Sequence, residues 1–244
     1  MNRHCLQFAL LLVLLVVVPA PSRAGLLDDM MKSLGSAETP GAGLDNGTIV
    51  KGLKEALATG TDKAVAAVSR PNGYFDNQAI KILIPEKLRS AADLLREFGY
   101  RQEVDDFVLG MNRAAEKAAP KATEYFIAAL KSMSFDDARK ILQGGDTSAT
   151  DYFRQKTGAD IHRAFKPVVS SSLQQVGAVK SYRQMMEKFN SIPFAGSMVS
   201  FDLDDYVVTK AVGGLFTMLG EEEKKIRTDP AARGTELLRT VFGN

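Results

Sequence analysis

Apolar residues recur every three or four positions through almost the whole sequence after residue 25, and this spacing constrains the fold more than any other feature. It places apolar side chains on one face of an α-helix. Only QAIKILIP, residues 78–85, alternates weakly, and a lone strand would have no partner, so we expect an extended loop there. The pattern predicts an all-α fold, an irregular bundle of about eight to ten helices in a single domain.

The expected helices are bounded by capping residues. Ser134 with Asp137 is typical of a helix start, and Gly144 of a helix end. Gly158 predicts a second helix end, with a new helix beginning at Asp160. We therefore expect separate helices on either side of Gly158.

The first 24 residues have the layout of a secretory signal peptide. Arg3 precedes an unbroken apolar run over 8–18, and Ser22-Arg23-Ala24 supplies small residues for cleavage after Ala24. The run is too short for a membrane span, which needs about 20 apolar residues, although an uncleaved anchor is the alternative. We expect an exported protein.

Removal of residues 1–24 would change the chemistry available to the chain. Cys5 is the only cysteine, so the mature chain would have no disulfide and no thiolate. Loss of Arg3 and Arg23 lowers the basic count from 31 to 29, which equals the 29 acidic residues. A neutral chain has no general field to attract nucleic acid. With His162 as the remaining histidine, we expect no metal site and no cofactor.

The mature chain divides into a short leading segment and one domain. Within 25–44, GLLDDMMKSLG predicts a short amphipathic helix, and the Gly-rich stretch 35–43 a flexible linker that tethers it loosely. Residues 45–244 are the all-helical domain. Membrane contact is expected only through residues 25–34, whose acids do not suit an anionic lipid surface.

The acidic cluster FDLDD, residues 201–205, allows a structural and a catalytic interpretation. Asp202 stands where an N-cap belongs, and Asp204 and Asp205 fall in the first turn, where the helix dipole favours negative charge. Asp204 and Asp205 point about 100° apart on a helix, so they do not converge on one ion. We therefore interpret Asp202 as a helix cap and, by the same pattern before Pro230, Asp229 as another.

A few polar residues near apolar stripes are candidates for a functional site. Arg113 and Glu116 are three residues apart and can pair on one helix face. Such groups either form an internal polar network or line a ligand pocket, and the sequence leaves both readings open. The candidates are Asn112, Arg113, Glu116, Tyr152 and Lys210.

Four stretches of the sequence carry a resemblance to a known family. They are NRAAEKAAPKA, SFDDARKIL, GGDTSATDYF and the C-terminal block that begins FDLDDYVVTKAVGGLF. Together they resemble the bacterial exported family catalogued as domain of unknown function 4197. The resemblance covers roughly residues 26–243, departs from the family pattern at Gly234, and implies an all-helical protein of the bacterial periplasm or cell envelope with no established activity.

Three functions are compatible with these features. The first is a non-enzymatic protein that binds an unidentified partner or small ligand in a groove between helices. The second is a metal-independent enzyme that uses Asp, Glu, Lys and Tyr side chains. The third is an envelope-associated structural protein that docks through its N-terminal helix.

Overall fold

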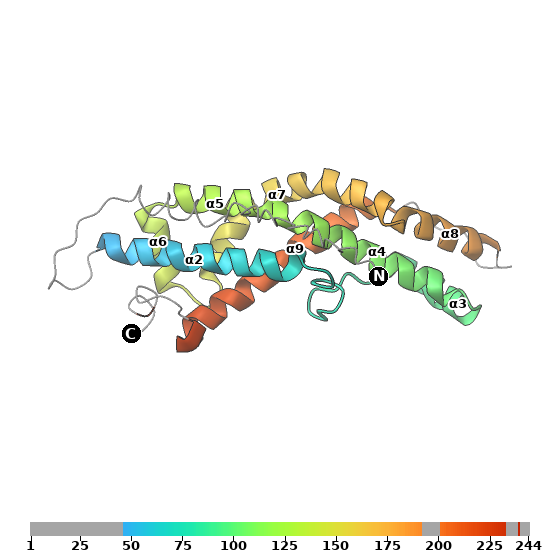
Figure 1. Cartoon of the computed structure of the whole chain (residues 1–244), viewed down its shortest axis with the longest axis horizontal. Helices are drawn as coiled ribbons and strands as arrows, with labels where there is room; N and C mark the ends of the chain where they lie inside the picture. The colour runs from blue at the N-terminus through green and yellow to red at the C-terminus, as the bar shows by residue number, and fades with distance from the viewer. Residues whose placement is uncertain (1–45, 192–200, 233–238, 240–244) are drawn as a thin grey trace, which may run out of the picture. The chain divides into compact units, whose positions relative to one another are not determined.

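The computed structural model describes residues 46–191, 201–232 and 239. No strand occurs among them, and the predicted all-α fold is confirmed (Figure 1). All of these residues belong to one compact unit, Leu44–Asn244. The helices are α2 (Asn46–Ser69), α3 (Glu86–Glu97), α4 (Arg101–Ala118), α5 (Ala122–Ser132), α6 (Phe135–Gln143), α7 (Ser148–Gln175), α8 (Ala178–Ser191) and α9 (Leu203–Thr228), with short 3-10 helices η1 (Ala119–Lys121) and η2 (Pro230–Ala232).

Three predictions fall outside the described residues. They are the signal peptide, the amphipathic helix with its linker, and the departure from the family pattern at Gly234. No helix in the described ranges is both long enough and apolar enough to cross a membrane.

The core lies where the four longest helices meet. α9 packs against α2 and α7, and α4 packs against α7 and α8 (Figure 1). At the centre the ring of Phe126 meets Phe153 at 5.3 Å and Phe216 at 6.0 Å, both edge-on. Edge-on pairs are the favoured arrangement of aromatic rings, so these contacts stabilise the junction of α5, α7 and α9.

Gly158 does not end a helix, so that prediction is wrong. α7 continues through it to Gln175, and Asp160 lies inside the helix, where it pairs with Arg163 instead of capping. A glycine inside a helix costs about 1 kcal/mol relative to alanine, but the continuous helix buries Ile161 and Phe165. Tertiary packing outweighs the local signal, and this region has fewer separate helices than expected.

The break between α7 and α8 falls at Gly177, whose φ of +78° is in the left-handed region. Beside this turn α4 approaches α8 closely at Gly110. A Cβ on Gly110 would stand 2.6 Å from the Cβ of Ala178. The absence of a side chain at Gly110 therefore sets the distance between the two helices.

The segment 70–85 joins α2 to α3 without regular structure. Residues 71–76 and 78–80 form turns, and residues 81–85 are irregular backbone, in agreement with the expected loop. Asn72 has a φ of 65°, which asparagine tolerates better than most residues. Turn hydrogen bonds within the segment, such as those from the amides of Gly73 to Arg70 and of Lys81 to Asn77, satisfy part of its backbone, and the neighbouring helices supply partners for other groups.

Candidate functional site

Asn112 on α4 supplies partners for the backbone of segment 70–85. Its side-chain oxygen accepts from the amide of Ile82 at 2.9 Å, and its side-chain nitrogen donates to the carbonyl of Ile82 at 2.8 Å. The same nitrogen donates to the carbonyl of Val108 at 2.8 Å. Asn112 thus pairs with Ile82 as a neighbouring strand would, and its side chain is fully buried.

Glu116, one helical turn further along α4, holds the beginning of the same segment. Its Oε1 accepts from the amides of Tyr74 at 3.2 Å and Phe75 at 3.4 Å. Its Oε2 accepts from Arg113 at 2.7 Å, and the guanidinium of Arg113 also donates to the side-chain oxygen of Asn72 at 2.5 Å. The carboxylate, only 5% exposed, therefore has a cation and two amide donors, as a buried charge requires.

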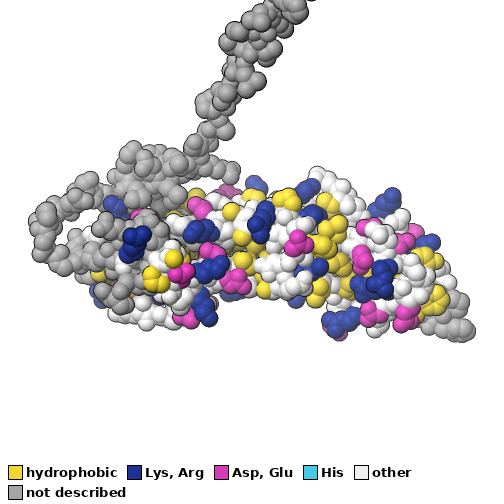
Figure 2. Space-filling model, turned by 60° about the horizontal axis from the view of Figure 1, so that its bottom comes forward, with side chains coloured by type: hydrophobic (Ala, Val, Ile, Leu, Met, Phe, Trp, Pro, Cys, Tyr) yellow, Lys and Arg dark blue, Asp and Glu magenta, His cyan; other side chains and the backbone are white. Residues whose placement is uncertain are grey.

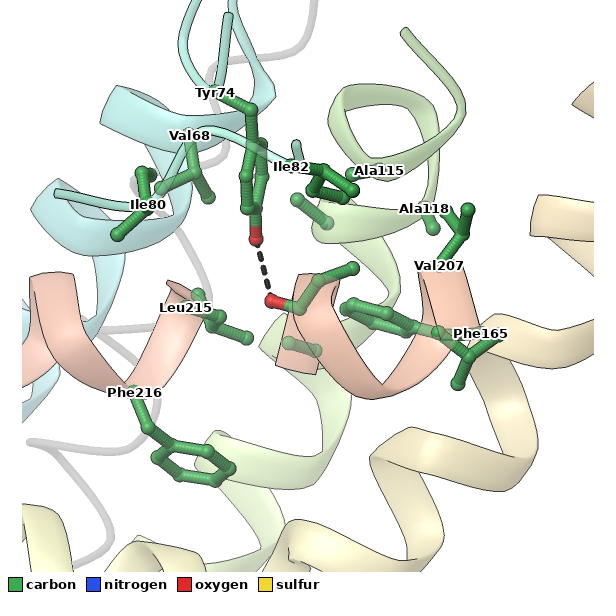
Figure 3. Packing of buried hydrophobic residues seen from close by; sticks show 14 of the residues in the cluster. Val68, Tyr74, Ile80, Ile82, Ala115, Ala118, Phe165, Val207, Leu215 and Phe216 are labelled. Atoms are coloured by element: carbon green, nitrogen blue, oxygen red, sulfur yellow. Dashed lines mark hydrogen bonds between the residues drawn. The ribbon is translucent and has the colours of Figure 1, made fainter. Parts of the chain in front are cut away.

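Tyr74 connects this segment to α9. Its ring is fully buried, and its hydroxyl donates to the carbonyl of Ala211 at 2.6 Å (Figure 3). Burial, followed by the nearby charge of Glu116, raises the pKa of Tyr74 far above its usual range. The ring lies against Gly214, where a Cβ would meet its Cε1 at 2.7 Å. The second glycine of the Gly213-Gly214 pair thus makes room for this ring.

The remaining two candidates lie elsewhere. The hydroxyl of Tyr152, on α7, donates to the carbonyl of Ala129 at 3.2 Å. Lys210 is exposed on α9, and its Nζ stands 5.7 Å from the centre of the Tyr206 ring. Neither shares a hydrogen bond or ion pair with Asn112, Arg113 or Glu116 in the described part of the chain.

A second buried carboxylate was not among the sequence candidates. Glu223 of α9, 5% exposed, accepts from the amides of Ala149 at 2.9 Å and Thr150 at 2.8 Å. These amides belong to the first turn of α7, which has no side-chain cap of its own. Arg227 pairs with Glu223 at 2.9 Å and donates to the carbonyl of Ile141 at 2.8 Å. The pair therefore joins α9 to both α6 and α7.

The sequence does contain a signal for Glu223. It stands four residues after Leu219 and three before Ile226, on the stripe that α9 buries. An acid at an apolar position of a helix needs an ionic or hydrogen-bonding partner inside the protein. The run of three glutamates, 221–223, hides this position, because such runs are usually solvated.

The two cap residues make local hydrogen bonds. Asp202 is the N-cap of α9, and its carboxylate accepts from the amide of Asp205 at 2.9 Å. Asp229 follows α9, and its carboxylate accepts from the amide of Ala231 at 2.9 Å in η2. Within the described ranges, no three His, Cys, Asp or Glu side chains form a group that could hold a metal ion.

Apolar side chains come to the surface where the end of segment 70–85 meets α9. Leu83 is 58% exposed, and its carbonyl accepts from the hydroxyl of Tyr206 at 3.0 Å. The ring of Phe201 lies 5.4 Å from that of Tyr206. We call Leu83, Phe201 and Tyr206 the apolar surface. Figure 2 turns the lower side of Figure 1 forward and shows hydrophobic side chains gathered over the middle of that face.

A small hollow lies between α2 and α9. Its volume is about 10 Å³, room for roughly one water molecule, and its walls are almost entirely apolar. That volume is below the range of about 300–1,000 Å³ typical of small-molecule sites. Its lining residues are Leu53, Ala56, Leu57, Glu223, Ile226 and Arg227.

The fold and these internal polar contacts define an all-helical domain whose buried polar side chains support its own backbone. The model of the family described as Protein of unknown function (DUF4197) matches residues 43–243. The chain therefore belongs to this family, and the resemblance found in the sequence is confirmed. No curated protein and no solved structure matches the chain.

Proposed function

We propose that the protein is a non-enzymatic binding protein of the cell envelope that recognises a protein partner through the apolar surface. The observation that carries the proposal is the exposure of Leu83 beside two aromatic rings. An exposed leucine alone needs no explanation, but grouped aromatic and aliphatic side chains with a polar surround are typical of interaction sites. Aromatic residues are also enriched among the side chains that dominate binding energy.

The internal polar contacts support binding rather than catalysis. Asn112 and Glu116 direct their acceptors at backbone amides of segment 70–85. Groups that hold a loop in this way are committed in the folded state and are not presented to a substrate. Segment 70–85 also carries Leu83. The role of Asn112 and Glu116 in this proposal is therefore to fix the conformation of the backbone that presents the apolar surface.

The charged side chains around the apolar surface indicate which kind of partner it binds. Lys210 stands over the Tyr206 ring, and Arg89 pairs with Glu86 at 2.5 Å near the same tyrosine. Charges of both signs therefore rim the site, as at ordinary protein interfaces with an apolar centre and a polar rim. The proposed partner is a protein that contributes an apolar side chain at the centre of the contact.

Photo-crosslinking from Lys210 tests this proposal. A photoreactive residue placed there should give one discrete adduct in the intact cell, and Leu83→Asp should remove it because a charge at the centre opposes burial. Phe135→Asp is the matched control: Phe135, at the start of α6, is 39% exposed, and the variant should leave the adduct unchanged. An adduct that survives Leu83→Asp would refute the proposed surface.

Export is a separate part of the proposal and rests on the signal-peptide pattern of residues 1–24. Fractionation of cells that produce the full chain should place a product lacking about 24 residues in the envelope fraction. Full-length protein in the cytosol would overturn this part alone. Deleting residues 25–34 should leave the fractionation unchanged, whereas a shift would favour envelope docking through that segment.

A further inference from the structure

We propose that Asn72-Gly73 is a deamidation site that the folded protein protects, and that isoaspartate formed at position 72 prevents the beginning of segment 70–85 from docking again on α4. The inference concerns covalent chemistry and does not depend on the proposed partner. Three features support it: the place of the Asn-Gly pair in a tight turn, the hydrogen bond of the Gly73 amide, and the contact of Arg113 with the Asn72 side chain.

The reaction joins the side chain of Asn72 to the backbone nitrogen of Gly73. Glycine is the most permissive residue at this position, because it has no side chain to hinder the approach. The deprotonated Gly73 nitrogen attacks Cγ of Asn72 and closes a cyclic imide. The bond from Cγ to Nδ2 breaks, and Nδ2 leaves as ammonia with the proton that the Gly73 nitrogen gave up. Water then opens the imide at either carbonyl, which leaves aspartate or isoaspartate.

The turn requires this reactive pair of residues. Asn72 has a φ of 65°, a left-handed conformation that asparagine adopts more easily than most residues. A Cβ on Gly73 would stand 2.5 Å from the carbonyl oxygen of Ala67 and 2.6 Å from that of Val68, so a side chain does not fit at position 73. The fold therefore retains a sequence that becomes chemically labile once the turn opens.

The closed turn keeps the nucleophile from forming. Gly73 is buried, and its amide donates to the carbonyl of Arg70 at 2.9 Å. A backbone amide in such a bond loses its proton to solvent only after local opening, which is why hydrogen-bonded amides exchange slowly. Attack on Cγ needs the same deprotonated nitrogen. The rate of deamidation in the folded protein is therefore proportional to the fraction of time that the turn is open.

Arg113 holds the other reacting group in the closed turn. Its guanidinium donates to Oδ1 of Asn72 at 2.5 Å while it pairs with Glu116 at 2.7 Å. Glu116 in turn accepts from the amide of Tyr74, the residue after Gly73. These contacts fix the chain on both sides of the Asn-Gly bond against α4. Loss of either side chain raises the open fraction and with it the rate of deamidation.

Isoaspartate at position 72 lengthens the backbone of the turn. Its main chain runs through the former side chain and gains a carbon atom before Gly73. One carbon–carbon bond adds about 1.5 Å, whereas Gly73 is confined against carbonyl oxygens of the last turn of α2. The amides of Tyr74 and Phe75 then no longer meet Glu116. Aspartate, by contrast, keeps the backbone length and an acceptor for Arg113.

Peptide mass spectrometry of the full chain tests the protection. Conversion adds about 1 Da to the peptide that contains Asn72. In concentrated urea, Asn72 and Asn46, which also precedes a glycine, should convert at similar rates. In buffer at the same pH and temperature, conversion of Asn72 should slow by the factor by which hydrogen exchange of the Gly73 amide slows, within about threefold. Equal rates for Asn72 in urea and in buffer would overturn the proposal.

Substitutions in the folded protein separate protection from activation. Arg113→Ala and Glu116→Ala should each speed conversion of Asn72 about tenfold or more. Lys117→Ala, at an exposed position of the same helix, should leave the rate unchanged. A slower conversion in Arg113→Ala would mean that the guanidinium activates Cγ, and would overturn the protective role. If these variants do not fold, the comparison of urea with buffer in the parent chain decides the question.

Refolding tests the consequence of isoaspartate. In a chain carrying Asn46→Ser, Asn72 is the only asparagine before a glycine, and prolonged incubation in urea converts it. After refolding, the isoaspartate product should exchange the amide of Tyr74 at least about tenfold faster than the parent, because Glu116 no longer accepts from it. Asn72→Asp is the matched control and should stay within about threefold of the parent. An isoaspartate product with the parent's exchange rate at Tyr74 would overturn this part of the proposal.

Discussion

The carboxylate of Glu116 on α4 accepts a hydrogen bond from the backbone amide of Tyr74, 42 residues earlier in the chain. Through this contact a helix holds in place a segment that has no regular structure of its own. Tyr74 then reaches α9 with its hydroxyl. Segment 70–85 is therefore fixed between two helices by a few specific hydrogen bonds.

Replacing Glu116 by alanine should lower the free energy of unfolding by about 2–4 kcal/mol, because two amide donors and Arg113 lose their acceptor. Urea unfolding followed by circular dichroism measures the change. Lys117→Ala, at the exposed neighbouring position, should change the free energy by less than about 0.5 kcal/mol. Similar losses for the two variants would mean that Glu116 does not hold the segment.

Glu223→Ala should destabilise the protein by about 3 kcal/mol, because the amides of Ala149 and Thr150 and the cation of Arg227 lose a buried partner. Amide exchange at Ala149 and Thr150 should increase more than elsewhere in α7. Glu221→Ala, at an exposed position of the same helix, is the control and should have little effect. An unchanged exchange rate at Thr150 would argue against capping from α9.

Gly213 and Gly214 should respond to alanine in opposite directions. A Cβ at Gly213 meets nothing within 4 Å, so Gly213→Ala should stabilise the protein by up to about 1 kcal/mol through helix propensity. At Gly214 the same Cβ would stand 2.7 Å from the Tyr74 ring and 3.1 Å from Ile80, and overpacking should cost about 1–3 kcal/mol. Thermal unfolding of both variants measures the signs. A stabilising Gly214→Ala would show that the ring can move away.

The capping box of α6 should make stability depend on pH at the acidic end. The hydrogen bond from the Ser134 hydroxyl, followed by that from its amide, lowers the pKa of Asp137. Because the folded pKa lies below the unfolded value of about 3.9, the contribution is complete above that pH and is lost as pH falls through the folded pKa.

Asp137→Ala measures this contribution. The variant should be less stable by about 1 kcal/mol at pH 6, and its difference from the parent should shrink toward pH 2. Asp136→Ala, at the exposed position beside it, should show a smaller difference at pH 6. A difference between Asp137→Ala and the parent that is constant over this range would contradict the role of ionised Asp137.

The candidate site could be predicted from the sequence only in part. The spacing of Arg113 and Glu116 predicted their pairing on one helix face, and the ion pair is present. The sequence could not show that Asn112 meets Ile82, because their contact depends on how segment 70–85 folds back over α4. Glu223 was missed for the same reason, since its partners are 73 and 74 residues away in the chain.

The sequence by itself determined the all-α class, the family and the caps at Ser134 and Asp202, because periodicity and capping involve residues a few positions apart. Only the tertiary structure decided that α7 continues through Gly158 and that Gly214 faces the ring of Tyr74. These outcomes depend on what packs against each position. Packing free energies of a few kcal/mol exceed the local preference of about 1 kcal/mol that a single glycine expresses.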